Sequence, residues 1–404
     1  MTFQIKSYIA RNGERFSLLF SPDAPGIPLF YPSAFMSRHL KPNNTHQTQL
    51  AALDGIRRLS EWERDRDFSI EDRFLAGELL AANEIDSLAE NVRARRRGKT
   101  DNVIGSSKFN SYWAHICSYI AWLTDELLPN RNDIEIRKLV DDQANRLKSK
   151  IIKRTGSKAR RKQRLLDEKL PEYARTQLLS LFCNPFQGLN TPLHRGTRLR
   201  NIVMFRILYE TGMRRGELLS LKLKNFVEAS GGQGAYLVIE RNHDDELDRR
   251  ANQPVAKTLG RSVPISEELE QQLIKYRIEY RSELRNVGYS DNAFIFCVHR
   301  SGRTEGQPIT VNGFNSAFLY LRNSFPSIGN SIHPHAFRHD WNYRFSLYAD
   351  EFGLTEEEEA ESREESMGWA PGSNMAKVYN QRHRKEKAMN IGRVVARDTE
   401  RPIK

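Results

Sequence analysis

The stretch HPHAFRHDWNYRF, residues 333–345, places three histidines and two arginines in thirteen positions. After its proline the stretch is expected to be helical, so residues four apart lie on one face. Imidazole and guanidinium groups this crowded are compatible with a zinc site, with a patch that binds phosphate, or with an ordinary helix rich in polar residues. The rest of the chain decides between these three readings.

Zinc is the least favoured of the three. His335 and His339 are four residues apart, as zinc ligands on a helix often are, and His333 offers a third ligand. However, no glutamate stands between the two helical histidines and no cysteine is near, while Arg338 lies between them and repels a dication. We therefore predict no metal site here.

The bulk composition favours a polyanionic partner. The 404 residues include 63 Lys and Arg against 51 Asp and Glu, a net charge of +12. Neutralising phosphates releases counterions, so this excess indicates nucleic acid before membrane. The start of the chain does not resemble a signal peptide, and no apolar run is long enough to span a bilayer. The three scattered cysteines predict buried thiols, and the protein is expected to be cytoplasmic.

A chain of this length is expected to form two domains. Weak alternation over 1–30 predicts a short N-terminal strand region, and helical periodicity predicts a helical domain over 31–147. A basic linker over 148–164 then leads to a mixed domain over 165–404. In that domain we predict strands at 235–241, 258–265 and 292–298 and a helix from Ser266, its N-cap, to about Asn286. The fold class is mainly α with a small antiparallel β-sheet.

Two strongly basic segments are candidate phosphate-binding elements. Residues 93–99, RARRRGK, have five basic side chains in seven, and residues 146–164 have ten in nineteen with no acidic one. A solvated linker explains flexibility, but the charge favours a segment that lies along a phosphate backbone. The residues expected to bind DNA are Arg93, Arg95, Arg96, Arg97, Lys153, Arg154, Lys158, Arg160, Arg161, Lys162 and Arg164.

Three other short boxes accompany the histidine-rich stretch. TGMRRGE, residues 211–217, puts Arg214 just beyond Gly212, where a helix is interrupted. AKTLGRSVPI, residues 256–265, puts Lys257 at the start of a strand in an expected hairpin. MGWAPGSNMAKVY, residues 367–379, puts Trp369 ten residues before Tyr379. Each box alone is a weak signal, and each has an ordinary structural explanation.

In this order, the four boxes resemble the catalytic domain of the tyrosine recombinases, or phage integrase family, over roughly residues 165–395. The departures are Met367 and Phe337 where leucine is common, Asp340 where threonine is frequent, Trp369 for the more usual histidine, and one extra residue before Tyr379. The resemblance implies the catalytic residues Arg214, Lys257, His335, Arg338, Trp369 and Tyr379, supported by Glu217 and His339.

The chemistry of these side chains suits the implied reaction. Two arginines offer planar, permanently charged forks for the oxygens of a phosphate, and a tryptophan can donate through its indole N–H. A tyrosine is a weak nucleophile unless a base, here His335, takes its proton. The resemblance implies that Lys257 protonates the departing 5′ oxygen. No metal or cofactor is expected.

The resemblance also implies a two-domain DNA clamp, in which a helical core-binding domain accompanies the mixed α+β catalytic domain. The expected partner is double-stranded DNA carrying specific sites, bound by a homotetramer on two duplexes. Without DNA the protein is expected to be a monomer, and accessory proteins are compatible with this scheme. A mobile element is the expected origin. Two alternatives stay open at this point, a type IB topoisomerase and a DNA-binding regulator that has lost catalysis.

Overall fold

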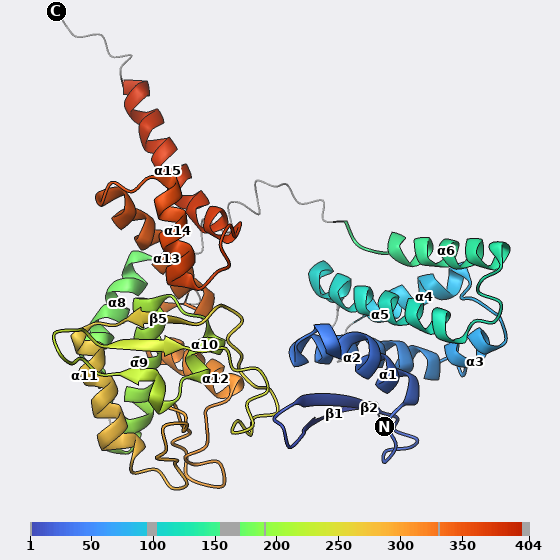
Figure 1. The fold of residues 1–404 in the computed structure, drawn as a ribbon, viewed down its shortest axis with the longest axis horizontal. Coiled ribbons are helices and arrows are strands. Elements are labelled where there is room, and N and C mark those ends of the chain that lie inside the picture. Colours follow the sequence, from blue (N-terminus) through green and yellow to red (C-terminus); the bar gives the residue numbers. More distant parts are fainter. Residues whose placement is uncertain (1, 95–102, 154–169, 190, 330–331, 398–404) are drawn as a thin grey trace, which may run out of the picture. The chain divides into compact units, whose positions relative to one another are not determined.

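The computed structural model describes residues 2–94, 103–153, 170–189, 191–329 and 332–397, except the side chains of Asn43 and residues 377–382. The chain divides into two compact units, Met1–Gly156 and Ser157–Lys404 (Figure 1). Over the described part of the chain, no helix is long and apolar enough to cross a membrane.

The first unit consists of helices packed against a β-hairpin. Its helices are α1 (Phe30–Phe35), α2 (His46–Arg64), α3 (Ile70–Leu75), α4 (Ala82–Arg93), α5 (Ser106–Leu127) and α6 (Ile134–Ser149), with a π-helical turn, η1 (Met36–Leu40), after α1. Helices α2 and α5 pack on each other closely at Gly55, where a Cβ would lie 3.1 Å from the carbonyl oxygen of Tyr112. Buried Trp62 and Trp113 belong to the same core.

The hairpin consists of β1 (Gln4–Ile9) and β2 (Arg15–Phe20), which pair antiparallel with Ile5 opposite Leu19. The predicted strand region therefore exists. Its inner face is part of the same hydrophobic core as the helices, because Phe3 and Leu19 are buried together with residues of α2 and α5.

The second unit holds a small sheet among many helices. The helices are α8 (Glu172–Cys183), α9 (Arg195–Thr211), α10 (Arg215–Ser220), α11 (Glu267–Lys275), α12 (Val311–Ser324), α13 (Pro334–Glu351), α14 (Glu356–Met367) and α15 (Met375–Arg397). The strands β3 (Phe226–Val227), β4 (Tyr236–Ile239) and β5 (Arg261–Pro264) form an antiparallel sheet in that order.

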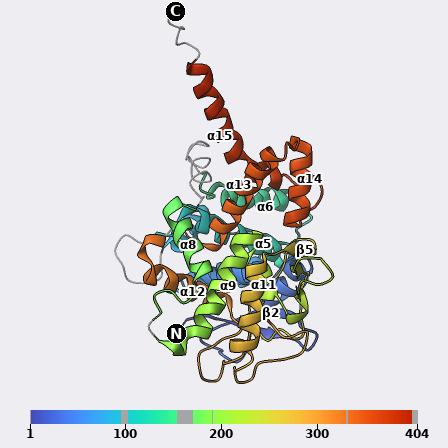
Figure 2. The same cartoon turned by 90° about the vertical axis from the view of Figure 1, so that its left-hand side faces the viewer.

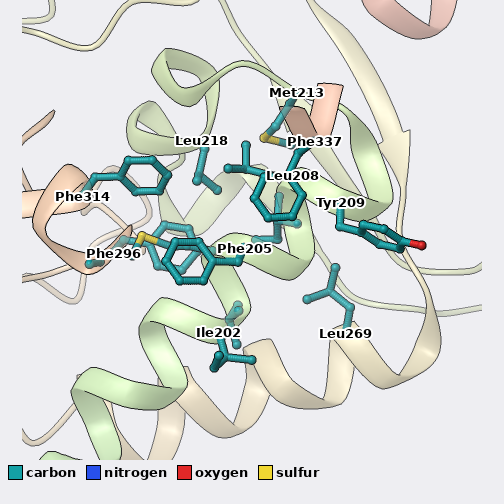
Figure 3. Packing of buried hydrophobic residues seen from close by; sticks show 14 of the residues in the cluster. Ile202, Phe205, Leu208, Tyr209, Met213, Leu218, Leu269, Phe296, Phe314 and Phe337 are labelled. Carbon is teal, nitrogen blue, oxygen red and sulfur yellow. The ribbon is translucent and has the colours of Figure 1, made fainter. Parts of the chain in front are cut away.

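Helix α9 is the centre of this unit. It lies among α8, α11 and α12 (Figure 2), and it also packs against α13. Most of its side chains are buried, so apolar residues appear on all its faces, as expected of a core helix. Figure 3 shows Phe205 of α9 in the same cluster as Leu218 of α10 and Phe337 of α13. This packing fixes α10 and α13 relative to α9.

The predicted fold class, mainly helical with a small antiparallel sheet, is confirmed. Strands β4 and β5 form within the two predicted segments, and Ser266 caps α11 by accepting a hydrogen bond from the Leu269 N–H at 3.3 Å. The helix continues beyond α11 as η5 (Tyr276–Arg281), a π-helical turn, and so ends earlier than predicted.

Two sequence predictions are wrong. Residues 292–298 do not form a strand, since Phe294 and Cys297 make only isolated bridges, to Lys222 and Pro308. The aromatic and β-branched run there is buried because it packs in the core, which alternation alone cannot distinguish from a strand. Cys183 is exposed, whereas Cys297 is buried and Cys117 is half-buried. Cys183 is the last residue of α8, where an apolar sequence neighbourhood does not ensure burial.

Candidate active site

Arg214 occupies the turn between α9 and α10. Helix α9 ends at Gly212, which adopts the left-handed conformation with φ of 62°. A Cβ there would also lie 2.8 Å from Cγ of Trp341, so glycine is needed both for the turn and for the close packing. Arg214 then takes the N-cap position of α10, with a half-buried side chain whose Nη1 lies 3.4 Å from Oε1 of Glu217.

Glu217 is fully buried and connects three parts of the site. Its carboxylate accepts hydrogen bonds from the backbone N–H of Arg214 at 2.9 Å, from the hydroxyl of Thr258 at 2.6 Å and from Nη2 of Arg261 at 3.0 Å. Burial acts to raise the pKa of Glu217, but the charge of Arg261 and these hydrogen bonds outweigh it and hold the pKa below its ordinary value. Glu217 is therefore ionised and ties the Arg214 turn to the segment beside Lys257.

Replacing Glu217 with glutamine is expected to destabilise the second unit at pH 7 by about 3 kcal/mol, because buried Arg261 loses its counter-charge. The folded-state pKa is depressed, so this stabilisation is present above the ordinary pKa of 4.5 and disappears as pH falls through the folded value. The difference between wild type and variant should therefore shrink at pH 3. Urea unfolding of the intact chain, followed by hydrogen exchange of peptides from α9 and α10, measures it.

The matched control for that prediction is Glu283→Gln, which removes the charge of an exposed carboxylate in the same unit. This control should change the free energy of unfolding by less than about 0.5 kcal/mol. A Glu217→Gln penalty that stayed constant from pH 7 to pH 3 would contradict the ionised, ion-paired state of Glu217.

Lys257 lies in the loop between β4 and β5. It is the exposed residue in the run 254–258, in which Pro254, Ala256 and Thr258 are buried. Just after it, the N–H of Leu259 donates to the carbonyl oxygen of Gly368 at 3.0 Å. Lys257 is therefore presented to solvent from a segment that contacts both α10 and the end of α14.

Helix α13 carries the histidine-rich stretch. His333 is its N-cap, because Nδ1 accepts a hydrogen bond from the Ala336 N–H at 3.2 Å. Arg338 is 1% exposed, and its Nη1 donates to the carbonyl oxygen of Gly212 at 2.8 Å, two residues before Arg214. Helix α13 therefore brings Arg338 directly against the Arg214 turn.

His335 is exposed on the first turn of α13, and the centroid of its ring lies 6.0 Å from that of His339, which is half-buried. Protein atoms around the ring exclude part of its hydration shell, which lowers the pKa of His335, and the positive charges of Arg338, Arg214 and Arg215 lower it further. The imidazole is therefore kept neutral near pH 7, the form in which it can accept a proton.

Trp369 follows the end of α14. Gly368 ends that helix with φ of 62°, and a Cβ there would lie 2.7 Å from the carbonyl oxygen of Leu259. The indole of Trp369 is buried, and Cζ of Arg338 lies 5.4 Å from its ring centroid, within cation–π range. Trp369 and Arg338 thus meet beside the turn that carries Arg214.

Tyr379 lies in the first part of α15, and its side chain is not among those described. Further along, α15 is attached to α13 by polar contacts. The hydroxyl of Tyr343 donates to Oε2 of Glu386 at 2.7 Å, and Oδ2 of Asp350 lies 2.8 Å from Nε2 of His383. Helix α15 is therefore docked on the helix that carries His335 and Arg338.

Most of the predicted DNA-binding residues lie outside the part of the chain that the structure describes. Arg95, Arg96 and Arg97 lie in 95–102, and the basic residues from Arg154 to Arg164 lie in 154–169, both outside the described residues. Arg93 and Lys153 are described, both belong to the first unit, and both are exposed.

In the described part of the chain, no three His, Cys, Asp or Glu side chains are grouped as metal ligands would be. His333, the third candidate ligand, caps α13 instead.

Sequence reasoning missed two residues of this site, Thr258 and Arg261. Arg261 donates from Nε to the carbonyl oxygen of Ser366 at 2.8 Å in addition to pairing with Glu217. The hydroxyl of Thr258 also donates to Glu217, and it accepts a hydrogen bond from Nη1 of Arg261 at 3.1 Å. The available signal was a charged residue at the start of the short strand RSVP, four positions after the motif lysine.

Comparison with known proteins gives both sequence and fold similarity. Residues 186–347 match the family model described as the phage integrase family. No curated protein matches the chain. The Tn1549 transposon integrase (residues 82–397), solved in complex with circular intermediate DNA, is 15% identical with a TM-score of 0.51, over 88% of this chain and 97% of that one. The XerH site-specific recombinase, bound to palindromic difH substrate after cleavage, is 18% identical with a TM-score of 0.49, over 87% and 81%.

The sequence match includes Arg214, Lys257, His335 and Arg338, and the remaining motif residues, Trp369 and Tyr379, follow it in the same unit. The fold agrees with that of the transposon integrase along most of both chains. The second unit of this chain therefore contains a domain of the phage integrase, or tyrosine recombinase, family.

Proposed function

We propose that the chain is a site-specific recombinase that cuts and rejoins double-stranded DNA through a 3′-phosphotyrosine intermediate. The observation that supports this best is the junction of α9, α10 and α13. There Arg338 donates to the carbonyl oxygen of Gly212, close to Arg214, and Trp369 packs against Arg338. The positive charges of both arginines lower the pKa of His335. One short region thus collects two guanidiniums, a neutral imidazole and an indole.

The proposed reaction begins with attack on phosphorus by the phenolic oxygen of Tyr379. As the oxygen–phosphorus bond forms, the phenolic proton passes to His335, which its surroundings keep neutral. The bond from phosphorus to the 5′ oxygen breaks, its electron pair stays on that oxygen, and Lys257 supplies the proton. Attack by a 5′ hydroxyl of another strand reverses these steps, so rejoining needs no ATP.

The two arginines would stabilise the extra negative charge that develops on the phosphate oxygens. Arg214 is half-buried, whereas Arg338 is 1% exposed and lies beneath the surface. Contact between phosphate and Arg338 therefore requires neighbouring side chains to move when DNA binds. Glu217 and His339 would support the arginines and His335 without touching the DNA.

The proposed partner is double-stranded DNA with a specific site. The net charge of +12 supports it, as do the basic segments at 93–99 and 146–164. The transposon integrase with the same fold was solved with DNA bound, which supports the same partner and the origin in a mobile element. A homotetramer on two duplexes belongs to this proposal.

Covalent trapping tests the function without a known target site. Fragments of the host genome are nicked at random, so that cleavage near a nick releases a short strand and leaves the adduct trapped. Wild-type protein is incubated with this pool in EDTA, and adducts are isolated under denaturing conditions. We expect a DNA-linked protein, a tryptic peptide with a nucleotide on Tyr379, and attached sequences that converge on one site.

Each alternative gives a different result in that experiment. Adducts at sequences without a preferred site would favour a type IB topoisomerase. Binding to fragments with no adduct at all would favour a regulator that has lost catalysis. An adduct mapped to any residue other than Tyr379 would overturn the proposed mechanism.

A further inference from the structure

Lys257 lies in the long loop between β4 and β5, residues 240–260, but its neighbours in the chain are held in place by burial and hydrogen bonds. An unrestrained segment that long samples many conformations, and a group on it reaches a target only part of the time. Here the residues on both sides of Lys257 are fixed. Ala256 is fully buried in the core, and Thr258 donates to Oε1 of Glu217 at 2.6 Å.

Asn242, at the opposite end of the loop, holds the segment just before Lys257. Its Nδ2 donates to the carbonyl oxygen of Pro254 at 3.0 Å, and its Oδ1 accepts from the N–H of Ala256 at 2.9 Å. The carbonyl oxygen of Asn242 also accepts a hydrogen bond from the side chain of Gln253. The side chain of Asn242 therefore joins the two ends of the loop, because it is hydrogen-bonded to the backbone of the residues before and after Val255.

That bonding also places Val255 against α10. A Cβ on Gly216 would lie 2.6 Å from the carbonyl oxygen of Val255, so the loop backbone rests directly on the turn after Arg214. Lys257 is two residues further along the chain, so the position of the Val255 backbone determines where the Lys257 side chain starts relative to Arg214.

The middle of the loop is fixed independently. Nη1 of Arg250 donates to the carbonyl oxygens of Leu219 at 3.0 Å and Ile309 at 2.8 Å, and its guanidinium pairs with fully buried Asp248. The same guanidinium lies 4.6 Å from the ring centroid of Phe294. Because this anchor holds the loop to the core, removing Asn242 alone should shift the segment near Lys257 without releasing the whole loop.

We propose that Asn242 is a positioning residue for Lys257, which it holds ready to protonate the leaving 5′ oxygen before DNA binds. This inference rests on the proposed function, because it needs Lys257 to act as the acid. The proton goes from the ammonium group to the 5′ oxygen as the bond to phosphorus breaks. Asn242 touches neither the DNA nor the reacting atoms and acts only through the loop backbone.

The test compares two nicked duplexes that carry the site recovered by covalent trapping. One has the natural 5′ oxygen at the scissile phosphate, and the other has sulfur in its place. A thiolate leaves without a proton because thiols are far more acidic than alcohols. A defect in delivering the proton therefore slows cleavage of the oxygen duplex alone, whereas a general structural defect slows cleavage of both duplexes.

In single-turnover adduct formation, Lys257→Ala is expected to be slower by about 10³-fold on the oxygen duplex and by less than about 3-fold on the sulfur duplex. Asn242→Ala should show the same pattern with a loss of roughly 10-fold to 100-fold on oxygen. The matched control is Asn252→Ala, which removes an exposed amide from the same loop and should match wild type on both duplexes.

A second variant, Asn242→Asp, keeps the acceptor for Ala256 and loses the donor to Pro254, so an intermediate selective loss is expected. If Lys257→Ala shows the selective loss but both Asn242 variants match wild type, or are slowed equally on the two duplexes, the positioning role is overturned and the function stands. If Lys257→Ala is slowed equally on both, Lys257 is not the acid and the inference fails with that part of the proposed function.

Discussion

Replacing Tyr379 with phenylalanine is expected to abolish the covalent DNA adduct while DNA affinity stays within about 2-fold of wild type. Phenylalanine keeps the aromatic ring but has no oxygen to attack phosphorus. Removing the nucleophile of an enzyme that works through a covalent intermediate costs on the order of 10⁶-fold in rate, far below detection in a gel assay. Adduct formation on the trapped site, with binding measured by fluorescence anisotropy at fixed salt, checks both parts.

The control is Tyr348→Phe, which removes the hydroxyl of an exposed tyrosine on α13. It should form the adduct at the wild-type rate. An adduct that persisted in Tyr379→Phe and disappeared in another tyrosine variant would place the nucleophile elsewhere and contradict the assignment. Wild-type rates of adduct formation in both variants would exclude Tyr379 and Tyr348 as the nucleophile.

The positions of two motif residues, Arg214 and Trp369, could be predicted from sequence because each follows closely on a glycine with a strict backbone role. Gly212 and Gly368 both adopt left-handed conformations, and both lie where a Cβ would clash. Such positions hold the chain in one local shape, so the residue that follows keeps its place in the fold. Arg214 and Trp369 are the side chains that these two turns present.

The buried connections between the motifs could not be predicted in the same way. Glu217 reaches Arg261 across 44 positions in the chain, and Arg261 reaches Ser366 across 105. Nothing in the sequence near Arg261 indicates which distant carboxylate or carbonyl it will meet. Such pairings depend on how α10, β5 and α14 pack, which is decided by the core around α9 and not by any local pattern.

The strand predicted at 292–298 failed for a related reason. Phe294, Ile295 and Phe296 are all buried, and a continuous apolar run of this length is typical of a strand inside a sheet. Arg281 donates to the carbonyl oxygens of Phe294 and Ile295, the N–H of Ile295 donates to the carbonyl oxygen of Leu221 at 3.0 Å, and the carbonyl oxygen of Phe296 accepts from the N–H of Ile309 at 3.0 Å. The segment therefore bonds to an arginine side chain and to two separate backbone neighbours through single bridges. The backbone there satisfies its hydrogen bonds without a ladder, and burial was mistaken for strand formation.

Replacing Arg338 with lysine is expected to slow adduct formation by about 10³-fold, even though the positive charge is kept. The guanidinium has several N–H donors in one plane, so Nη1 can stay on the carbonyl oxygen of Gly212 while others face a phosphate. A lysine ammonium has neither the fork nor the flat face that lies 5.4 Å from the Trp369 ring. It cannot hold Gly212 and present a planar donor pair at the same time.

Single-turnover adduct rates separate this effect from DNA binding. Affinity should fall by less than about 3-fold at fixed salt, because one phosphate contact among many contributes little to the total. Arg344→Lys is the matched control, since Arg344 lies on the same helix, is partly buried, and pairs with Asp340 at 3.0 Å. A loss for Arg338→Lys that matched the loss for Arg344→Lys, or that appeared wholly as weaker binding, would mean that Arg338 serves the packing of α13 and not the transition state.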